Sequence, residues 1–412
     1  MSKLSLSKEK IKVVLLEGVH PLAEESFRKD GYNNITYLKG TPEKEELKTL
    51  LSDAHILGIR SRTHITQDVL DACDKLMAIG TFCIGTNQIN LEYARNKGIP
   101  VFNAPFSNTR SVAELVLAEI IFLMRGIPQK NAAAHRGQWQ KTAESSFEIR
   151  GKKLGIVGFG HIGSQLGVIA ESLGMKVYFY DIENKLPMGN AKNTESLNEL
   201  LAKVDVLSLH VPSTAATKDM IGKQQLNKMR QGSYLINAAR GDVVVIEDLI
   251  DALDSGKIKG AALDVFPQEP SSNNDPFISQ LKEYDQVIIT PHIGGSTLEA
   301  QVNIANEVSN KLMKYSNNGT TSSAVNFPQV SLPEIGGKQS RVMHIHKNKP
   351  GMLEQVNRIF SKHDMNITAL HLQTEGEIGY VIMDVDCSEV DDLKTELKSI
   401  DDTLRVRVLH GS

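Results

Sequence analysis

The stretch Leu154-Gly-Ile-Val-Gly-Phe-Gly-His-Ile-Gly163 decides the fold, because an apolar run leads directly into the spacing Gly158-x-Gly160-x-x-Gly163. A second apolar run ends at Asp181, 23 residues after Gly158. This order is typical of a strand–helix–strand unit that binds a dinucleotide. The first glycine permits a tight turn, the second lets a pyrophosphate approach the backbone, and the third lets the helix pack closely on the strand. A glycine-rich turn in some other α/β fold would not explain the acid.

The same motif indicates which cofactor is bound. A pyrophosphate would lie at the N-terminus of the helix, where free N–H groups and the helix dipole favour negative charge. The Asp181 carboxylate would accept hydrogen bonds from both ribose hydroxyls and repel a 2′-phosphate, and Ile182 follows it rather than an arginine. The sequence therefore predicts NAD rather than NADP, although Lys185 lies near enough to temper that preference.

Composition limits the classes of protein that remain. A chain of 412 residues with 41% hydrophobic and 23% charged residues is typical of a globular protein with two or three domains. The net charge of −3 gives no reason to expect nucleic acid or an anionic membrane as a partner. Three cysteines, Cys73, Cys83 and Cys387, indicate neither a disulfide framework nor a metal site. With a polar N-terminus that has no signal-peptide core, we expect a cytoplasmic protein.

The chain reads as three domains. Residues 11–103 alternate short β-rich runs with helical patterns, which predicts a separate doubly wound parallel sheet of the flavodoxin-like type. A long helix is expected at 111–127, with Ser111 as its N-cap and Pro128 ending it. A helical stretch at 297–315 leads back to the first domain, which is therefore split. We expect a substrate domain at 1–107 and 296–330, a Rossmann NAD domain at 108–295 and a third domain at 338–412.

Three ionisable residues follow strands of the predicted NAD domain, where parallel sheets bind their ligands. They are Arg240, Glu269 and His292. Each alone would more often be structural, but together they fit the oxidation of a hydroxyl group by hydride transfer. Histidine can remove the hydroxyl proton near neutral pH, a glutamate can stabilise the imidazolium, and an arginine can hold a substrate carboxylate. The chemistry points to a 2-hydroxy acid.

Four motifs of the chain together resemble those of a known family. The glycine motif, Asn237-Ala-Ala-Arg-Gly241, Asp264-Val-Phe-Pro-Gln-Glu-Pro270 and Thr290-Pro-His-Ile-Gly-Gly295 are similar to signatures of D-isomer-specific 2-hydroxyacid dehydrogenases. The resemblance implies that Arg240, Glu269 and His292 are catalytic, and Ala239, where many members have serine, leaves those charged roles untouched. It also implies that the cofactor is lined by Gly158, Gly160, His161, Ile162, Gly163, Asp181, Ala238, Ala239, Arg240, Asp264, His292, Ile293, Gly294 and Gly295.

A group of basic and small polar residues narrows the substrate. Arg60, Ser61 and Arg62 follow the third strand of the first domain, and Asn108 and Lys141 belong to the segments beyond it. Together with Arg240, these residues are suited to a phosphate-bearing acid, since guanidinium and ammonium groups bind phosphate well. The alternative is an ordinary solvated basic loop.

The tail has its own pattern of strand, helix, strand, strand, helix and strand. It resembles an ACT domain, a small amino-acid-sensing βαββαβ module. With this tail the chain resembles members of the family that oxidise 3-phospho-D-glycerate to phosphohydroxypyruvate (3-phosphooxypyruvate) with NAD at the start of L-serine biosynthesis. That resemblance implies a homotetramer inhibited by L-serine, with effector contacts at His346, Asn348 and Asn366. Loop capping would be the ordinary role for the two asparagines.

Two other functions remain open from the sequence. The same scaffold serves glyoxylate or hydroxypyruvate reductases, which the sensing tail and the basic group argue against. The fold also serves as an NADH-sensing transcriptional corepressor, a binding protein rather than an enzyme, although a groove for a recruiting peptide is not readable in the sequence.

Overall fold

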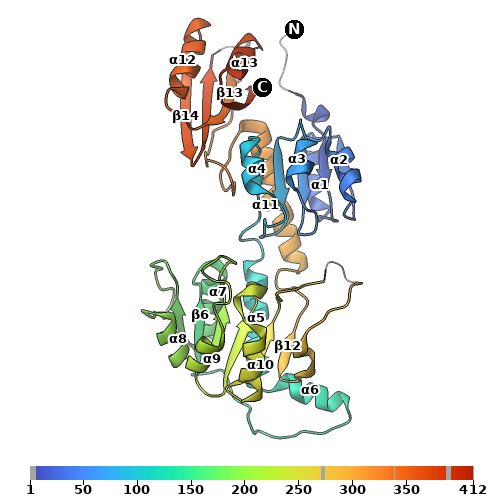
Figure 1. Ribbon diagram of the computed structural model, residues 1–412, viewed down its shortest axis with the longest axis vertical. Coiled ribbons are helices and arrows are strands. Elements are labelled where there is room, and N and C mark those ends of the chain that lie inside the picture. Colours follow the sequence, from blue (N-terminus) through green and yellow to red (C-terminus); the bar gives the residue numbers. More distant parts are fainter. Residues whose placement is uncertain (1–5, 271–273, 338, 387–390, 412) are drawn as a thin grey trace. The chain divides into compact units, whose positions relative to one another are not determined.

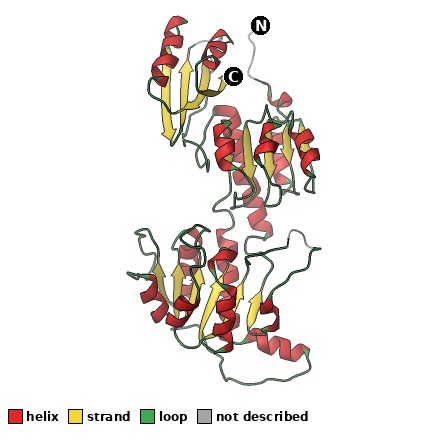
Figure 2. Cartoon of the chain, in the orientation of Figure 1, coloured by secondary structure: helices red, strands yellow, loops and turns green. Residues whose placement is uncertain are grey.

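The computed structural model describes residues 6–270, 274–337, 339–386 and 391–411. The chain forms two compact units, one of residues 1–107 with 301–412 and the other of residues 108–300 (Figure 1). Helices and strands alternate through most of both units (Figure 2). No helix among the described residues is both long and apolar enough to cross a membrane.

The first unit opens with a five-stranded parallel sheet of order β2-β1-β3-β4-β5, the flavodoxin-like order that was predicted. The long helix α11 packs on this sheet, and a side chain at Gly80 would collide with Val308 and Leu312. The elements are β1 (Val13–Leu15), α1 (Leu22–Lys29), β2 (Ile35–Tyr37), α2 (Lys44–Leu51), β3 (Ile56–Ile59), α3 (Gln67–Asp71), β4 (Ala78–Thr81), α4 (Leu91–Asn96), β5 (Val101–Phe102) and α11 (Leu298–Asn318).

The tail adds a four-stranded antiparallel sheet of order β14-β15-β13-β16 to the same unit. Two helices cover one face through an apolar core that includes Val356, Phe360 and Leu397, while Met343, Tyr380 and other residues of the opposite face join the core of the first domain. This is the predicted βαββαβ arrangement. Its elements are β13 (Ser340–Lys347), α12 (Met352–Lys362), β14 (Ile367–Glu375), β15 (Ile378–Val385), α13 (Asp391–Lys398) and β16 (Thr403–His410).

The second unit contains a seven-stranded parallel sheet of order β12-β11-β10-β9-β6-β7-β8. The order reverses between β6 and β9, the position at which doubly wound sheets bind dinucleotides. Apolar cores lie on both faces of the sheet. The elements are α5 (Thr109–Met124), α6 (Ile127–His135), β6 (Lys153–Val157), α7 (His161–Ser172), β7 (Lys176–Tyr180), β8 (Lys192–Asn193), α8 (Leu197–Lys203), β9 (Val206–Leu209), α9 (Lys223–Lys228), β10 (Ser233–Asn237), α10 (Ile246–Asp254), β11 (Ile258–Leu263) and β12 (Val287–Ile289).

The helix expected at 111–127 is present in the structure, but it begins and ends at other residues. Helix α5 begins at Thr109, with Asn108 rather than Ser111 as the residue before it, and it ends at Met124. Gly126 then adopts a left-handed conformation (φ 58°), and Pro128 lies in the first turn of α6. A proline in that turn costs no hydrogen bond, so here it starts a helix instead of ending one.

A buried ion pair joins β13 to β15. The Arg341 guanidinium has no exposed surface and donates to both oxygens of Asp384, at 2.6 and 2.7 Å. The same guanidinium donates to the backbone carbonyls of Asn318 and Pro333, both at 2.9 Å, and so links the ACT-like sheet to the end of α11.

Replacing Asp384 with alanine should therefore leave the buried Arg341 guanidinium without its carboxylate partner. We expect Asp384→Ala to lower the free energy of unfolding of this unit by about 3–5 kcal/mol, the usual cost of leaving one partner of a buried pair uncompensated. Chemical denaturation followed by circular dichroism measures the effect, with the exposed Asp401→Ala as control. Equal stability of the two variants would show that Asp384 does not hold Arg341.

Candidate active site

The sequence-predicted pair of His292 and Glu269 meets in the second unit. His292 Nδ1 lies 2.8 Å from Glu269 Oε2, and Glu269 Oε1 accepts the backbone N–H of Phe266 at 3.1 Å. Because an ionised carboxylate can only accept, Nδ1 carries the proton and the other ring nitrogen, Nε2, is left to exchange a proton with a ligand. The imidazole is 54% exposed, so a ligand can reach it.

The contact also sets the charge of both groups. The hydrogen bond to Glu269 raises the pKa of His292 above its ordinary value, against the opposing effect of burial. Burial pushes the pKa of Glu269 upward, but the hydrogen bond and charge of His292 outweigh it, so this pKa lies below its ordinary value. The pair therefore favours an imidazolium beside a carboxylate and can take up or release one proton near neutral pH.

Asp264 holds the turn that carries His292. Its Oδ1 accepts the Thr290 hydroxyl at 2.6 Å and the Ile293 N–H at 2.8 Å, and its Oδ2 accepts the Gly294 N–H at 2.7 Å. His292 itself has a φ of 53°, a left-handed conformation that a non-glycine residue adopts only when its surroundings impose it. Asp264 therefore fixes the backbone on both sides of the imidazole.

Arg240 follows β10 and is held by a neighbouring asparagine. Asn237 donates through Nδ2 to the Arg240 carbonyl at 2.9 Å and accepts the Ala239 N–H through Oδ1 at 3.1 Å. The guanidinium is half-buried and donates to the Ala239 carbonyl at 2.6 Å. The turn of Arg240 packs against the segment that leads to Glu269, because a Cβ at Gly241 would lie 2.0 Å from the Phe266 carbonyl carbon. The structure therefore brings the three predicted catalytic residues together, and the charge of Arg240 lowers the pKa of both Glu269 and His292.

The glycine motif fits a dinucleotide as expected. A Cβ at Gly158 would lie 2.4 Å from the His210 carbonyl oxygen, and one at Gly163 would lie 2.2 Å from the Gly158 carbonyl oxygen. A Cβ at Gly160 would meet nothing within 4 Å, so open space faces the backbone there. That space adjoins the start of α7, which begins at His161 and continues through Ile162, so a pyrophosphate there would face the N-terminal, positive end of a helix dipole.

Asp181 lies at the end of β7 beside this turn. One carboxylate oxygen accepts the Phe159 N–H at 2.8 Å and the other accepts the Glu183 N–H at 2.9 Å. The nearby Lys185 ammonium forms an ion pair with Glu183, so its charge is partly compensated. This geometry fits a ribose with free hydroxyls better than one that bears a 2′-phosphate.

The residues expected to bind substrate fall in different places. Asn108 lies beside the His292 turn, because a Cβ at Gly295 would come within 2.3 Å of its Nδ2. Lys141 lies in the exposed loop after α6. Arg136, at the start of that loop, pairs with Asp285 at the amino end of β12 at 2.5 Å, and the Thr142 carbonyl next to Lys141 accepts from Lys130 of α6 at 3.2 Å. His292 follows the carboxyl end of β12, so within one chain these contacts hold the Lys141 loop toward the other edge of the sheet. Arg60, Ser61 and Arg62 belong to the first unit, directly after β3.

The expected effector residues are also divided. His346 is buried near the end of β13. Asn348 directly follows this strand and donates through Nδ2 to the Gly376 carbonyl at 3.2 Å. Asn366 is exposed and precedes β14. His346 is paired with Gly379 of β15, whereas the start of β14 is paired with Val385, six residues away. At about 3.3 Å per residue the two ends are about 20 Å apart along the strand, so one chain does not bring the three together.

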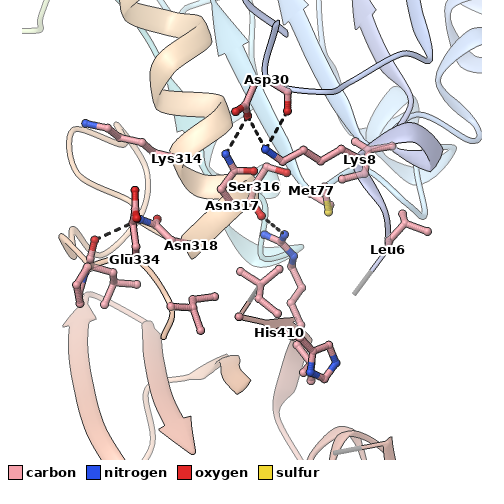
Figure 3. Close-up of a pocket in the computed structure, with 18 of the residues that line it drawn as sticks. Leu6, Lys8, Asp30, Met77, Lys314, Ser316, Asn317, Asn318, Glu334 and His410 are labelled. Atoms are coloured by element: carbon pink, nitrogen blue, oxygen red, sulfur yellow. Dashed lines mark hydrogen bonds and ion pairs between the residues drawn. The ribbon is translucent and has the colours of Figure 1, made fainter. Parts of the chain in front are cut away.

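A cavity of about 910 Å³ lies within the first unit. Figure 3 shows its polar wall, where Lys8 and Asn317 both donate to Asp30 at 2.9 Å. None of the predicted catalytic, cofactor or effector residues lines it. This cavity therefore does not mark the catalytic residues.

The sequence left some supporting residues unassigned. Asn237 and Thr290 were quoted as parts of motifs without a role, yet each makes a side-chain hydrogen bond that shapes the site. His210 follows β9 and shares a hydrogen bond of 2.8 Å with Ser208, and burial of its ring lowers its pKa to about 4, so it is neutral. The sequence did offer a signal for Asn237 and Thr290, since each lies at the end of a strand. Such residues are common in turns, however, so this position alone does not assign them a role in the site.

Comparison with known proteins agrees with this geometry. Residues 117–294 match the family "D-isomer specific 2-hydroxyacid dehydrogenase, NAD binding domain", and residues 342–405 match the "AHAS small subunit-like ACT domain". D-3-phosphoglycerate dehydrogenases of Haemophilus influenzae and Escherichia coli are each 58% identical to the chain. The matches cover 99% and 100% of this chain, respectively, and 100% of each relative.

Solved structures agree on the fold of the two parallel-sheet domains. The TT0316 protein of Thermus thermophilus has a TM-score of 0.69 at 29% identity, covering 76% of this chain and 100% of its own. D-lactate dehydrogenase of Aquifex aeolicus, solved with NAD and lactic acid, has a TM-score of 0.67 at 27% identity, covering 77% and 100%. The chain is thus an NAD-binding oxidoreductase with an ACT domain, and it belongs to the D-isomer-specific 2-hydroxyacid dehydrogenase family, within the group of D-3-phosphoglycerate dehydrogenases.

Proposed function

We propose that this chain oxidises 3-phospho-D-glycerate to phosphohydroxypyruvate with NAD, as the first step of L-serine biosynthesis, and that L-serine inhibits it. The observation that carries the proposal is the His292–Glu269 pair at 2.8 Å beside Arg240. It occurs in a chain that matches D-3-phosphoglycerate dehydrogenases from end to end.

In the proposed reaction, the substrate loses the hydroxyl proton and the C2 hydrogen, and a C=O bond forms. His292 Nε2 takes the proton, and Glu269 stabilises the imidazolium that results. Bound NAD supplies the acceptor for the hydride that leaves C2. Arg240 holds the substrate carboxylate and stabilises negative charge on the oxygen. In the reverse direction, the imidazolium returns the proton.

The cofactor residues follow from the same proposal. Gly158, Gly160, His161, Ile162 and Gly163 would hold the pyrophosphate, and Asp181 the adenosine ribose. Residues on the turns around Arg240 and His292 would line the nicotinamide end: Ala238, Ala239, Arg240, Asp264, His292, Ile293, Gly294 and Gly295.

We assign the phosphate end of the substrate to Arg60, Ser61, Arg62, Asn108 and Lys141. The anchoring of the Lys141 loop toward the amino edge of the sheet supports a role for this lysine in the site of a second copy of the chain. The separation of Asn366 from His346 and Asn348 likewise supports an L-serine site shared by two ACT-like domains. Both placements favour an oligomer, and we propose a homotetramer.

The domain division of the proposal is a substrate domain at 1–107 and 296–330, an NAD domain at 108–295 and an ACT domain at 338–412. We also propose a cytoplasmic location. Among the described residues Cys73 and Cys83 are free thiols, which fits a reducing compartment.

The function is tested by following NADH consumption with phosphohydroxypyruvate, glyoxylate and hydroxypyruvate in separate assays, each with and without L-serine. We expect the phosphorylated substrate to have a kcat/KM at least about tenfold above the others, since its phosphate adds charge-assisted contacts. L-serine should lower the rate. A preference for glyoxylate would favour a reductase of that acid. Absence of turnover with every 2-oxo acid would favour a cofactor-sensing binding protein.

The His292→Ala variant tests the assigned base. Removing the imidazole should lower kcat about a hundredfold to ten-thousandfold, the usual contribution of a positioned acid or base, while NADH still binds. Stopped-flow turnover and NADH fluorescence measure the two effects. His363→Ala is the matched control, because His363 pairs with Glu396 at 3.1 Å in the ACT-like domain, and it should keep wild-type turnover. Near-normal turnover of His292→Ala would exclude the catalytic role.

A further inference from the structure

Glu17 is a buried acid that the proposed mechanism does not use. It lies after β1, from which only Leu16 separates it. The residue is 3% exposed and has a φ of 61°. Gly18 after it also has a positive φ, of 58°. A left-handed conformation is ordinary for Gly18 but strained for a glutamate, so the surroundings of Glu17 must hold it in place.

The Glu17 carboxylate lies beneath the loop that follows β3. Its Oε1 accepts the backbone N–H groups of Arg60 at 3.1 Å and Thr63 at 2.8 Å, and its Oε2 accepts that of Arg62 at 2.9 Å. Strands β1 and β3 are parallel neighbours, so their carboxyl ends lie side by side. One carboxylate thus satisfies three donors of a single loop.

A second side chain holds the same loop from its carbonyl side. Gln88 is 7% exposed, and its Nε2 donates to the Arg60 carbonyl at 2.6 Å and to the Gly85 carbonyl at 3.3 Å. Arg60 is therefore fixed at both its N–H, by Glu17, and its C=O, by Gln88. Few backbone rotations remain possible between these two anchors.

The arrangement separates buried negative charge from accessible positive charge. The Glu17 side chain is 1% exposed, whereas that of Arg62, whose Nε lies 3.7 Å from Glu17 Oε2, is 52% exposed. Because Glu17 takes the N–H groups of Arg60, Arg62 and Thr63 inward, those donors cannot bind a ligand. Recognition of an anion by this loop is left to the side chains of Arg60, Ser61 and Arg62 and to the Ser61 N–H.

We propose that Glu17 and Gln88 are positioning residues that fix the Arg60-Ser61-Arg62 backbone so that these side chains meet the phosphate group of the substrate. The inference rests on the proposed function, which assigns the phosphate to this loop. It predicts a defect that depends on the phosphate, whereas a role in stability alone would affect all substrates equally.

The test compares Glu17→Gln with the wild type on two substrates. The amide turns a donor toward N–H groups that need an acceptor, so at least one of them loses its partner. We expect KM for phosphohydroxypyruvate to rise about tenfold or more, with kcat falling less, because a misplaced binding loop weakens contacts remote from the chemistry. The kcat/KM for unphosphorylated hydroxypyruvate and the Kd for NADH should stay within about twofold of wild type.

Two further variants make the result decisive. Glu25→Gln is the matched control, since Glu25 is exposed on α1, and it should behave as wild type. Gln88→Met removes the second anchor with little change in volume, and it should show the same phosphate-dependent defect even if Glu17→Gln does not fold.

Several outcomes would overturn the inference. An unchanged KM for phosphohydroxypyruvate in a folded Glu17→Gln variant would do so, as would equal losses on both substrates. If Glu17→Gln does not fold, an unchanged KM for phosphohydroxypyruvate in Gln88→Met would overturn the inference. A wild-type enzyme that does not prefer the phosphorylated substrate would instead refute the proposed function, so the two failures are distinguishable.

Discussion

The hydrogen bond between His292 and Glu269 is the interaction on which the site depends. It fixes which ring nitrogen is free, raises the pKa of the imidazole and keeps a compensating charge beside it. His292 makes this bond from a left-handed backbone conformation, and Asp264 holds the turn through three hydrogen bonds. The fold supplies both segments at the carboxyl edge of one sheet.

The two units share one structural arrangement, a buried carboxylate that orders a loop. In each, a buried carboxylate accepts backbone N–H groups and so shapes a loop that carries functional side chains: Asp264 does this for the His292 turn, and Glu17 does it for the Arg60 loop. Each arrangement also includes a residue with positive φ, His292 in one and Glu17 in the other. An acceptor with two oxygens can hold several donors at once, which a hydroxyl or amide cannot match.

Much of the site could be predicted because its residues fall at strand ends. The glycine spacing, the acid at Asp181 and the positions of Arg240, Glu269 and His292 each follow a rule that links sequence position to one edge of a parallel sheet. The two parallel sheets and the βαββαβ tail followed from the pattern of strands and helices along the chain. The features that could not be predicted depend on contacts between segments far apart in the sequence. Glu17 acts on a loop that begins 43 residues later, and Gln88 acts on the same loop from 28 residues beyond it, and no spacing rule connects them. Lys141 and Asn366 carry the right chemistry but lie apart from their expected partners within one chain.

The most direct measurement is the pKa of His292, from an NMR pH titration of its ring protons, assigned by comparison with His292→Ala. The carboxylate stabilises the protonated ring, so the pKa should lie above the ordinary value of about 6.5 and fall in Glu269→Gln. Since oxidation requires the neutral ring, the acid limb of kcat/KM for the hydroxy acid should move to lower pH in the same variant. An identical pKa in both proteins would contradict the account.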